Sequence, residues 1–475
     1  MAYLHTTQRQ ILNIPHGHSQ RQLDAFSPDL RVRRGVTGEA TMPTMQPSAK
    51  KRQAKEAQRE VWSLFSGAMG LDLGLESVGL PATLAVEIDR DCCNTIRANR
   101  PELSVIEGSV SELSGDSLRE VRGGFAGEVF MMVGGPPCQS FSPGGNRAGL
   151  SDSRGNLIYE YMRLISEVRP RYFVFENVAN IVTAALRHRP IAERPGKNWN
   201  LSAYKVSNGA GDDGTAPLAV DEMAGSAIQQ ILRDYLAIGY HIHFGVLDAA
   251  DYGASQHRLR FVMLGAREGL APPAIPAATH GPGRAHPFRT VRDAIADLEC
   301  SPGPHSVYTP DVAKYFREVP EGKNWRSLPP DMQRAAMGPS FEAGGGKTGF
   351  FRRLAWERPS PTITGAANRK ASALCHPSQT RPVSVHECAR IQGFPDDWHV
   401  TGSMAAQYRQ IGNAVPVALG AAVGAAVLAC EGAAARTQAK PCADSQLAAA
   451  QSRLKASARN KVARKNASLP LFAEA

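Results

Sequence analysis

The sequence predicts an α/β protein: a doubly wound sheet with helices on both faces, joined to a second, smaller, irregular domain. Two observations predict this. Short apolar segments alternate with amphipathic, helix-period segments over residues 60–268, whereas residues 270–380 are rich in Pro, Gly and Arg and lack that alternation. Strands alternating with helices are typical of a parallel sheet that is covered on both faces.

The alternation can be followed along the chain. Strands are predicted over Val61–Phe65, Ala82–Glu87, Phe130–Val133, Tyr172–Phe175 and Arg260–Leu264. Helices are predicted over residues 71–78, 91–99, 157–168 and 228–238. In sheets of this kind the active site lies at the carboxyl ends of the strands. We therefore expect chemically important motifs at strand ends.

Composition divides the chain into five parts. Residues 1–58 form a basic tail that is predicted to be disordered, and residues 431–475 form a second basic tail. Between them we expect a first, α/β domain over residues 59–268, a second domain over 269–380, and a return to the first domain over 381–430. Residues 181–226 are rich in Arg, Pro and Gly and are predicted to be a surface insertion within the first domain.

Charge is unevenly distributed. The chain carries a net +10, of which residues 431–475 contribute +5, while residues 266–390 hold seventeen Lys/Arg against eleven Asp/Glu. A basic second domain fits a polyanionic partner, although ordinary surface variation would give the same count. The C-terminal tail either touches a phosphate backbone without sequence preference or serves only solubility.

Other composition signals exclude whole classes of protein. The eight cysteines show no CxxC spacing, so neither a metal site nor a disulfide framework is expected, and a reducing cytoplasm is the default location. No stretch of about 20 apolar residues is present, so no membrane span is expected. The N-terminus lacks the pattern of a secretory signal.

The first motif is the glycine turn Phe65–Gly70, which stands between a strand and a helix. Glycines at such a turn let the backbone approach a ligand, and a helix N-terminus supplies N–H donors. Glu87 ends the next strand, where a carboxylate can accept hydrogen bonds from ribose hydroxyls. Phe65 is suited to lie flat on a purine. The alternative is a tight turn with no ligand.

The second and third motifs follow two further strands. Cys138 lies in the run Gly-Gly-Pro-Pro-Cys-Gln-Ser-Phe-Ser, and Glu176 lies in Phe-Glu-Asn-Val. Prolines stiffen a loop and fix the direction of the cysteine, which makes Cys138 a better nucleophile candidate than an isolated buried cysteine. Glu176 gains weight from its place beside this loop, since alone it would be interpreted as a helix cap.

Two motifs lie nearer the C-terminus. In Gln256-His257-Arg258-Leu259-Arg260, the alternation of an extended backbone puts Gln256, Arg258 and Arg260 on one face. Arginines that face into a site suit a phosphate or a base carbonyl; the alternative is an exposed basic edge strand. The Gly-Asn turn in Gln410–Pro416 precedes an Ala/Gly-rich helix and is a candidate part of a cofactor site.

Together these motifs resemble the DNA cytosine-5 methyltransferase family over roughly residues 60–425. The matching stretches are FSGAMGLDLGL, VEID, GGPPCQSFS, FENV, QHRLR, RPVSVHECARIQGFPDDW and YRQIGNAVP. The resemblance implies an S-adenosylmethionine-dependent methyltransferase (Rossmann-like) sheet, with residues 269–380 as a target-recognition domain. It implies methyl transfer from S-adenosylmethionine to C5 of a cytosine in a specific double-stranded DNA sequence.

The resemblance also assigns roles to residues. It makes Cys138 the nucleophile that attacks C6 of a flipped cytosine, and Glu176 the carboxyl that protonates N3. Arg260 would hold the cytosine O2, and Arg258 would brace the site and an adjacent phosphate. The residues implied to bind the cofactor are Phe65, Gly67, Met69, Gly70, Leu71, Glu87, Ile88, Ser109, Val110, Pro136, Asn413, Ala414 and Val415.

The implied partner is double-stranded DNA. The residues expected to contact it are Gln139, Ser142, Arg154, Gln256, Arg352, Arg353 and Arg369. The three last arginines suit guanine edges and phosphates equally. The family further implies a bacterial restriction-modification enzyme that is monomeric, lies in the cytoplasm on the nucleoid, and has a cognate restriction endonuclease as a candidate partner.

Three alternatives remain at this point. An RNA cytosine-5 methyltransferase on the same fold is disfavoured by the length of residues 270–380, which suits a duplex DNA target. A non-catalytic DNA-binding regulator is disfavoured by the intact Cys138, Glu176 and Arg260. A dehydrogenase on a doubly wound sheet is disfavoured because GxGxxG spacing is missing.

Overall fold

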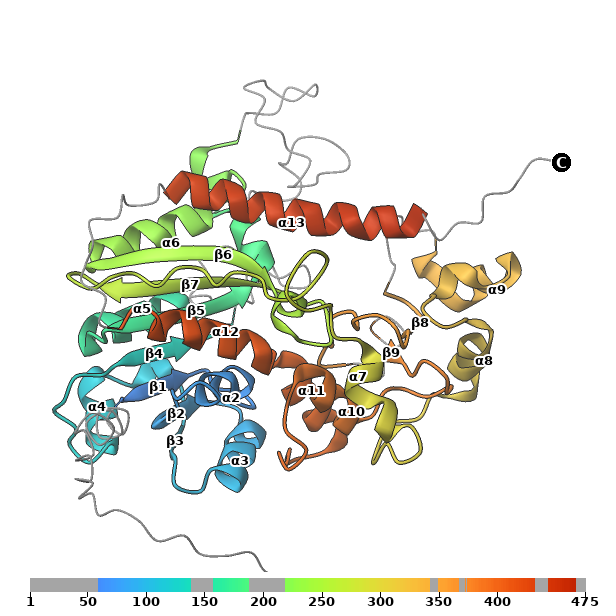
Figure 1. The fold of residues 1–475 in the computed structure, drawn as a ribbon, viewed down its shortest axis with the longest axis horizontal. Helices are drawn as coiled ribbons and strands as arrows, with labels where there is room; N and C mark the ends of the chain where they lie inside the picture. Colours follow the sequence, from blue (N-terminus) through green and yellow to red (C-terminus); the bar gives the residue numbers. More distant parts are fainter. Residues whose placement is uncertain are drawn as a thin grey trace, which may run out of the picture. The chain divides into compact units, whose positions relative to one another are not determined.

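The computed structural model describes residues 59–137, 157–187, 218–341, 349–366, 372, 374–431 and 443–466, with side chains in the last segment described as far as Ala456. Its centre is a seven-stranded sheet of order β3-β2-β1-β4-β5-β7-β6 (Figure 1). The strands are β1 Val61–Leu64, β2 Leu84–Glu87, β3 Ser104–Glu107, β4 Met131–Gly134, β5 Tyr172–Val178, β6 Tyr240–Asp248 and β7 Leu259–Arg267.

The parallel arrangement predicted from the sequence is confirmed for β1 to β5, but β7 runs antiparallel to both β5 and β6. The sequence did not reveal β6, whose histidines alternate with apolar residues at a half-exposed sheet edge. Because β7 is antiparallel, its first residues lie beside the last residues of β5: Arg260 pairs with Val178. The motif that precedes β7 therefore still reaches the carboxyl edge of the parallel strands.

Helices cover both faces of the sheet, as predicted. One face packs against α4 Gly115–Val121, α5 Leu157–Val168 and α6 Ser226–Ala237, and the other against α2 Gly70–Glu76, α3 Arg90–Asn99 and α12 Val417–Leu428. The first core holds large aromatics such as Trp62, Tyr161 and Phe173, all with no exposed surface. Their burial removes much apolar area from water and fixes the sheet that carries the strand ends.

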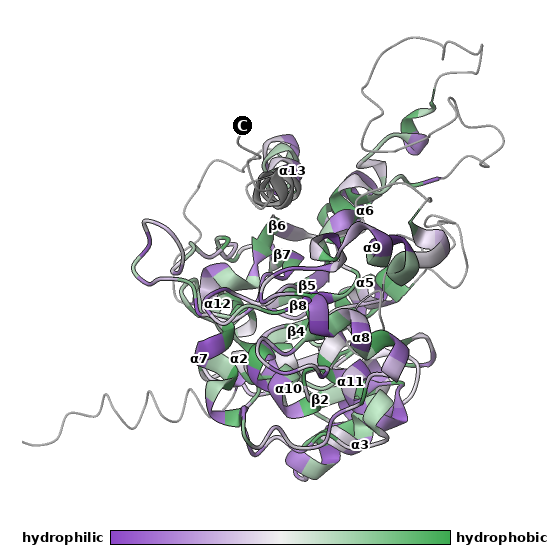
Figure 2. Ribbon diagram, turned by 90° about the vertical axis from the view of Figure 1, so that its right-hand side faces the viewer, coloured by the Kyte–Doolittle hydropathy of each residue, from purple (hydrophilic) through white to green (hydrophobic). Residues whose placement is uncertain are grey.

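The irregular region has little regular structure. It contains α7 Val291–Ile295, α8 Pro310–Glu318, α9 Pro330–Met337 and two short strands, β8 Arg352–Arg353 and β9 Leu374–Cys375. Tyr308, Phe316 and Phe351 form part of a small core of their own. In contrast, α7 shares a core with α10 Val385–Gln392 and α11 Met404–Asn413. The domain limits 269–380 thus stay a prediction. In Figure 2 the ribbons of α7 and α10 carry the colour of hydrophilic residues over much of their length.

The structure describes part of the C-terminal tail and both ends of the predicted insertion, but not the N-terminal tail. Residues 1–58 lie outside the described part. Within the C-terminal tail, α13 Ala443–Asn466 is a helix that packs on β6, with Leu447, Ala450 and Leu454 in the sheet's core (Figure 1). The described ends of the predicted insertion meet, because the backbone N–H of Arg187 donates to the carbonyl of Asp221 at 2.9 Å.

Among the described residues, one helical stretch, Met404–Leu428, has the length and apolar composition of a membrane span, and half of its most apolar window is buried within the protein. Its second part, α12, packs tightly on α2 through glycines. A Cβ on Gly74 would lie 2.2 Å from the Val417 carbonyl oxygen, and one on Gly420 would lie 2.3 Å from that of Leu71. This close packing is that of a core helix.

Candidate active site

The glycine turn leaves β1 in a strained conformation. Phe65, Gly67 and Met69 all have positive φ angles, of 59°, 53° and 64°. A positive φ is costly for residues with a Cβ, and such strain is often found at functional sites. A Cβ at Gly67 would meet no atom within 4 Å, so the turn borders open space. These features are those of a backbone cradle for a ligand.

Glu87 holds this cradle in place from the end of β2. Its Oε2 accepts a hydrogen bond from the Gly67 N–H at 2.7 Å, and its Oε1 accepts from the N–H groups of Ile88 and Asp89, both at 2.9 Å. A carboxylate has about four acceptor sites, so capacity remains for hydroxyl groups of a ligand. Beside it, the Ile88 side chain is 69% exposed, which leaves an apolar surface next to the carboxylate.

The remaining predicted cofactor residues border the same region. Ser109 follows β3 and caps a short helical turn that begins at Val110, which is buried. The Gly108 N–H donates to the Glu87 carbonyl at 3.0 Å, so the ends of β2 and β3 are joined. Leu71 lies in the first turn of α2 and is partly exposed.

The C-terminal motif reaches the glycine turn from the far end of the chain. A Cβ on Gly70 would lie 2.3 Å from the Val415 carbonyl oxygen and 3.1 Å from the Ala414 Cβ. Asn413, which precedes them, is exposed, and its carbonyl accepts from Arg258 at 3.1 Å. Only a glycine at position 70 permits this approach, so the structure brings the first and last motifs together.

Gly70→Ala is expected to weaken cofactor binding about 5- to 150-fold, because the added methyl group would push residues 413–415 away from the turn. Overpacking against backbone typically costs about 1–3 kcal/mol, and about 1.4 kcal/mol corresponds to tenfold in affinity. Isothermal titration with S-adenosylmethionine measures this. Gly108→Ala is the matched control, since its Cβ would meet only Ile106 Cγ2 at 4.0 Å. Equal affinities of the two variants would contradict the prediction.

The proline loop after β4 is held by residues at the end of β5. The Asn177 side-chain amide donates to the Pro136 carbonyl at 3.0 Å, and Asn177 Oδ1 accepts from the Val178 N–H at 2.8 Å. A Cβ on Gly135 would lie 2.9 Å from Glu176 Oε2, so glycine lets the carboxyl lie directly against the loop. Pro136 stands two residues before Cys138.

Glu176 forms a buried ion pair with arginine. Its Oε1 lies 2.7 Å from Arg260 Nε, and the two side chains are 10% and 13% exposed. Burial raises the pKa of the Glu176 carboxyl above its ordinary value, although Arg260 and Arg258 act against this. Burial also lowers the pKa of Arg260. A buried carboxyl with a raised pKa suits proton delivery.

Arg258 lies near this ion pair and is held by contacts with three other segments. Its guanidinium donates to the carbonyls of Ile363 at 2.7 Å and Asn413 at 3.1 Å, and its backbone N–H donates to Asp248 Oδ1 at 2.9 Å. Only 2% of Arg258 is exposed. It thus connects β7 to the segment that borders the glycine turn. Its burial agrees with bracing but leaves it little surface for the phosphate contact that we also predicted.

Two residues predicted to contact DNA are buried instead, which corrects the prediction. Gln256 has no exposed surface; its amide donates to Gln392 Oε1 at 2.7 Å and its Oε1 accepts from the Ile363 N–H at 3.2 Å. Arg353 is 6% exposed, and its guanidinium donates to the carbonyls of Phe316, Val319, His376 and Gln379. Both side chains hold the irregular region together. Their hydrogen-bonding groups are taken up by partners far away in sequence.

Of the other residues predicted to contact DNA, the structure describes Arg352. This arginine is partly buried, and burial lowers the pKa of its guanidinium. Cys138, Gln139, Ser142, Arg154 and Arg369 lie outside the described residues, so their predicted roles stay predictions.

Sequence analysis missed two positioning residues. Asn177 fixes the proline loop, and its signal was its place next to Glu176 in the same short motif. Arg409 forms ion pairs with Asp89 at 2.9 Å and Asp91 at 3.2 Å, which ties α11 to the end of β2 and the start of α3. Sequence analysis could not detect these ion pairs, because more than 300 residues separate Arg409 from its partners.

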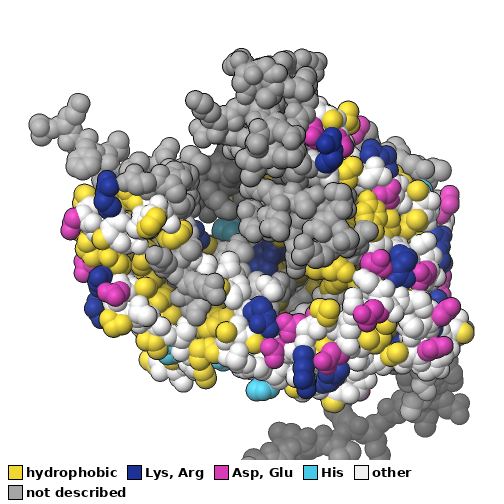
Figure 3. Space-filling model, turned by 180° about the vertical axis from the view of Figure 1, so that it is seen from behind, with side chains coloured by type: hydrophobic (Ala, Val, Ile, Leu, Met, Phe, Trp, Pro, Cys, Tyr) yellow, Lys and Arg dark blue, Asp and Glu magenta, His cyan; other side chains and the backbone are white. Residues whose placement is uncertain are grey.

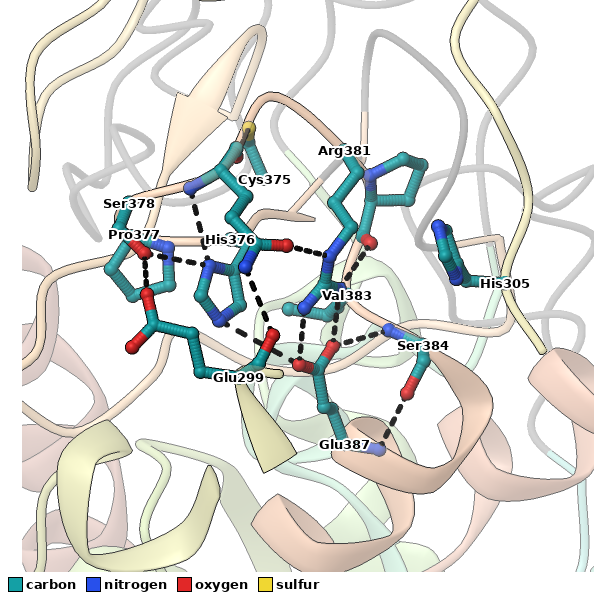
Figure 4. Close-up of polar contacts among 12 residues, drawn as sticks. Glu299, His305, Cys375, His376, Pro377, Ser378, Arg381, Val383, Ser384 and Glu387 are labelled. Atoms are coloured by element: carbon teal, nitrogen blue, oxygen red, sulfur yellow. Dashed lines mark hydrogen bonds and ion pairs between the residues drawn. The ribbon is translucent and has the colours of Figure 1, made fainter. Parts of the chain in front are cut away.

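A second buried polar cluster lies at the base of the irregular region (Figure 4). Arg381 donates to both oxygens of Glu387, at 2.7 Å each, and Glu387 also accepts from the Ser384 N–H at 2.6 Å. The His376 ring points toward the same carboxylate, with Nε2 at 3.6 Å from Oε1. Burial lowers the pKa of His376 to about 4, against the opposing effect of Glu387. This histidine is therefore neutral near pH 7.

Acid is expected to destabilise the protein through His376. Its pKa falls from 6.5 to about 4 on folding, so between these values the unfolded chain binds more protons and the free energy of unfolding falls as pH falls. The effect is up to about 3 kcal/mol across this interval. Urea unfolding from pH 7 to 4 should show a flatter pH dependence for His376→Gln. An unchanged pH dependence in His376→Gln would contradict the prediction.

Charge on the described surface is mixed. Figure 3 shows the face behind that of Figure 1, where Lys and Arg side chains are interspersed with Asp and Glu. On this face the visible Lys and Arg side chains do not form a single basic patch. Within the described ranges, no group of three or more His, Cys, Asp or Glu side chains is arranged to hold a metal ion.

Comparison with known proteins matches the chain to one family. The family model for C-5 cytosine-specific DNA methylase matches residues 60–191 and 219–429. The Type II methyltransferase M.Eco47II of Escherichia coli is 37% identical over 374 residues, covering 78% of each chain. M.Sau96I of Staphylococcus aureus is 34% identical and covers 78% of this chain and 76% of its own.

Among solved structures, a candidate DNA modification methyltransferase encoded within an E. coli prophage aligns with a TM-score of 0.53 at 20% identity. The alignment covers 79% of this chain and 99% of that one. At this identity the likeness concerns the fold.

Proposed function

The chain belongs to the C-5 cytosine-specific DNA methylase family, and from that premise we propose that it methylates one cytosine within a specific double-stranded DNA sequence through a covalent intermediate on a flipped base. It is a DNA cytosine methyltransferase of the Type II class. The observation that carries the finer proposal is the buried Glu176–Arg260 pair, which lies against the loop that leads into Cys138.

The glycine cradle fits S-adenosylmethionine. The turn at Phe65–Gly70 borders open space, Glu87 has acceptor capacity for ribose hydroxyls, and the exposed Ile88 offers an apolar surface to adenine. When bound, S-adenosylmethionine supplies an activated methyl group on its sulfonium. Residues 413–415 close the cradle from the other side.

The protein's own residues activate the cytosine. C5 of cytosine is a weak nucleophile, so the Cys138 thiolate adds to C6 and forms a Cys–C6 bond. The ring then gains negative charge, and Glu176, whose pKa is raised by burial, delivers a proton to N3. Arg260 holds the cytosine O2 next to that carboxyl. C5 takes the methyl group as the bond between methyl and sulfonium breaks; the C5 proton then passes to water, N3 returns its proton to Glu176, and the Cys138–C6 bond breaks to release the thiolate and restore the aromatic ring.

Attack on C6 requires access to the face of the ring, so the base must leave the helical stack. The burial of Glu176 at 8% exposure supports a pocket that a flipped base enters rather than a surface that reads a stacked one. Residues 269–380 recognise the DNA target sequence, and Arg352 and Arg369 remain as candidate DNA contacts in this region. We place the enzyme in the bacterial cytoplasm on the nucleoid, as a monomer, with a restriction endonuclease as its possible partner.

Transfer of a tritiated methyl group from S-adenosylmethionine to duplex DNA and to transfer RNA tests this proposal. Label in 5-methylcytosine of DNA is the expected result, and label in RNA alone would favour the RNA methyltransferase alternative. Bisulfite sequencing of DNA from cells that express the chain then gives the methylated sequence. Methylation at every cytosine, without a common motif, would contradict sequence specificity.

A further inference from the structure

The first half of the C-terminal helix α13 is docked on the sheet by polar as well as apolar contacts (Figure 1). Its apolar side chains that join the core of β6 and α6 are Leu447, Ala450 and Leu454. The Phe244 N–H, in the middle of β6, donates to Gln446 Oε1 at 2.9 Å. Because β6 is the last strand in the order of the sheet, this glutamine satisfies a backbone donor at the sheet edge.

Two further polar contacts lie one to two turns along the helix. Gln451 Nε2 donates to the Val182 carbonyl at 2.9 Å, in the short 3-10 helix η3 Ala179–Thr183. Arg453 forms an ion pair with Asp251, in the short 3-10 helix η6 Ala249–Tyr252. Burial raises the pKa of the Asp251 carboxyl, and the charge of Arg453 opposes this rise. Residues 451–453 of α13 thus join η3 to η6, which are far apart in sequence.

The contact between α13 and η3 requires a glycine at the start of α6. Gly225 is the N-cap of α6 and has a φ angle of 93°. A Cβ at this position would lie 3.0 Å from Gln451 Nε2 and 3.3 Å from the Val182 carbonyl oxygen. A side chain there would crowd both partners of the hydrogen bond. The fit of Gln451 into this corner is therefore close packing and not an incidental surface contact.

The two segments that α13 joins lead to the two members of the buried ion pair. Helix η3 begins directly after β5, the strand that carries Glu176. Helix η6 begins after Asp248, whose carboxylate accepts from the Arg258 backbone N–H at 2.9 Å and so holds the start of β7. Arg260 lies two residues further along β7 and pairs with Glu176 at 2.7 Å. Contacts of one helical turn of α13 thus act on the backbone on both sides of this pair.

We propose that α13 positions the Glu176–Arg260 pair for catalysis by holding η3 and η6 in place through Gln451 and Arg453. This inference rests on the proposed function, because it takes Glu176 as the proton donor to N3 and Arg260 as the holder of the cytosine O2. The family model ends at residue 429, so its match gives no role to α13. Neither phosphate contact nor solubility, the roles that composition suggests for this tail, accounts for the docked contacts.

The direct test is a pair of substitutions in the full chain, Gln451→Ala and Arg453→Gln. A displacement of about 1 Å by a change far from the chemistry can lower a rate about 10²-fold. We expect each substitution to lower kcat about tenfold and the combination about 10²-fold. KM for S-adenosylmethionine should stay at the wild-type value, because the contacts of α13 given above do not include the glycine turn. Arg453→Lys keeps the charge and should restore most of kcat.

Gln446→Ala is the matched control, because it removes a contact of the same helix with the middle of β6, away from η3 and η6. It should leave kcat unchanged even if it lowers the urea midpoint of unfolding. The Arg453 side chain is 47% exposed, and ion pairs of this kind contribute little to stability. Arg453→Gln should therefore unfold at nearly the wild-type urea concentration, so that its lower kcat would not result from unfolding.

A double-mutant cycle with Asp251→Asn shows whether Arg453 acts through its partner. If it does, the combination of Arg453→Gln and Asp251→Asn lowers kcat no further than either change alone. Additive losses, an equal fall of kcat in Gln446→Ala, or wild-type kcat after loss of both Gln451 and Arg453 would overturn the inference. Failure of the proposed function has a different signature: the wild-type chain would transfer no methyl group to DNA, or Glu176→Gln would keep the wild-type kcat.

Discussion

Cys138→Ser is expected to abolish methyl transfer, with a loss of at least about 10³-fold in kcat, while binding of DNA and S-adenosylmethionine persists. A serine hydroxyl is a far weaker nucleophile than a thiolate at neutral pH, so C5 would remain unactivated. The segment that leads into Cys138 is held by Asn177 and lies against Glu176, and serine changes neither contact. Tritium transfer at saturating DNA measures kcat, and filter binding measures affinity.

Cys300→Ser provides the control, since this cysteine is exposed and lies outside the site. A duplex containing 5-fluorocytosine adds a direct test, because fluorine at C5 blocks the last elimination and should leave the wild-type enzyme covalently attached in the presence of S-adenosylmethionine. Normal turnover by Cys138→Ser, or no trapped complex with the wild type, would refute covalent catalysis by this residue.

Glu176→Gln is expected to lower kcat by about 10²- to 10⁴-fold, the usual range for loss of a positioned proton donor. Glutamine keeps the shape of the side chain but cannot deliver a proton to N3. It also leaves Arg258 and Arg260 without a negative partner in a buried site, and loss of one member of a buried pair typically costs about 3–5 kcal/mol of stability. Single-turnover transfer and urea unfolding separate these two effects.

Glu60→Gln is a matched control for the stability effect. Glu60 is as buried as Glu176, at 6% against 8% exposure, and pairs with Arg122 at 2.6 Å, but it lies before β1, at the opposite edge of the sheet. We expect Glu60→Gln to lower stability and leave kcat unchanged. If both variants lost activity in proportion to stability, Glu176 would be a structural residue, and the proposed proton transfer from Glu176 to N3 would be contradicted.

Much of the site could be predicted from sequence because each motif is local. Phe65–Gly70, Glu87 and Glu176 each follow a short apolar strand, and carboxyl ends of parallel strands meet at one edge whatever the details of packing. The same rule assigned Pro136 and the loop that leads into Cys138. Helix α5 was equally evident, because its apolar residues recur at helical spacing within a dozen residues, and α12 was expected from its Ala- and Gly-rich composition.

Strand direction and side-chain burial that depend on residues far away in sequence could not be predicted. The antiparallel direction of β7 comes from its pairing with β6, a half-exposed strand whose alternation gave no clear signal. The burial of Gln256 and Arg353 comes from carbonyls and amides more than a hundred residues away for Gln256 and about 20 to 40 residues away for Arg353. Sequence patterns show that a side chain is polar, not whether its partner is water, protein or DNA.

The fold class, the order of the motifs along the strand ends, and the nucleophile and carboxyl candidates could all be predicted from residue patterns. The tertiary structure revealed which arginines are available: Arg260 pairs with Glu176, while Arg258 and Arg353 donate to carbonyl groups. It also showed that part of the basic C-terminal tail is a helix anchored on β6. The physical reason is that backbone propensity acts over a few residues, whereas desolvation of a charge depends on everything that packs around it.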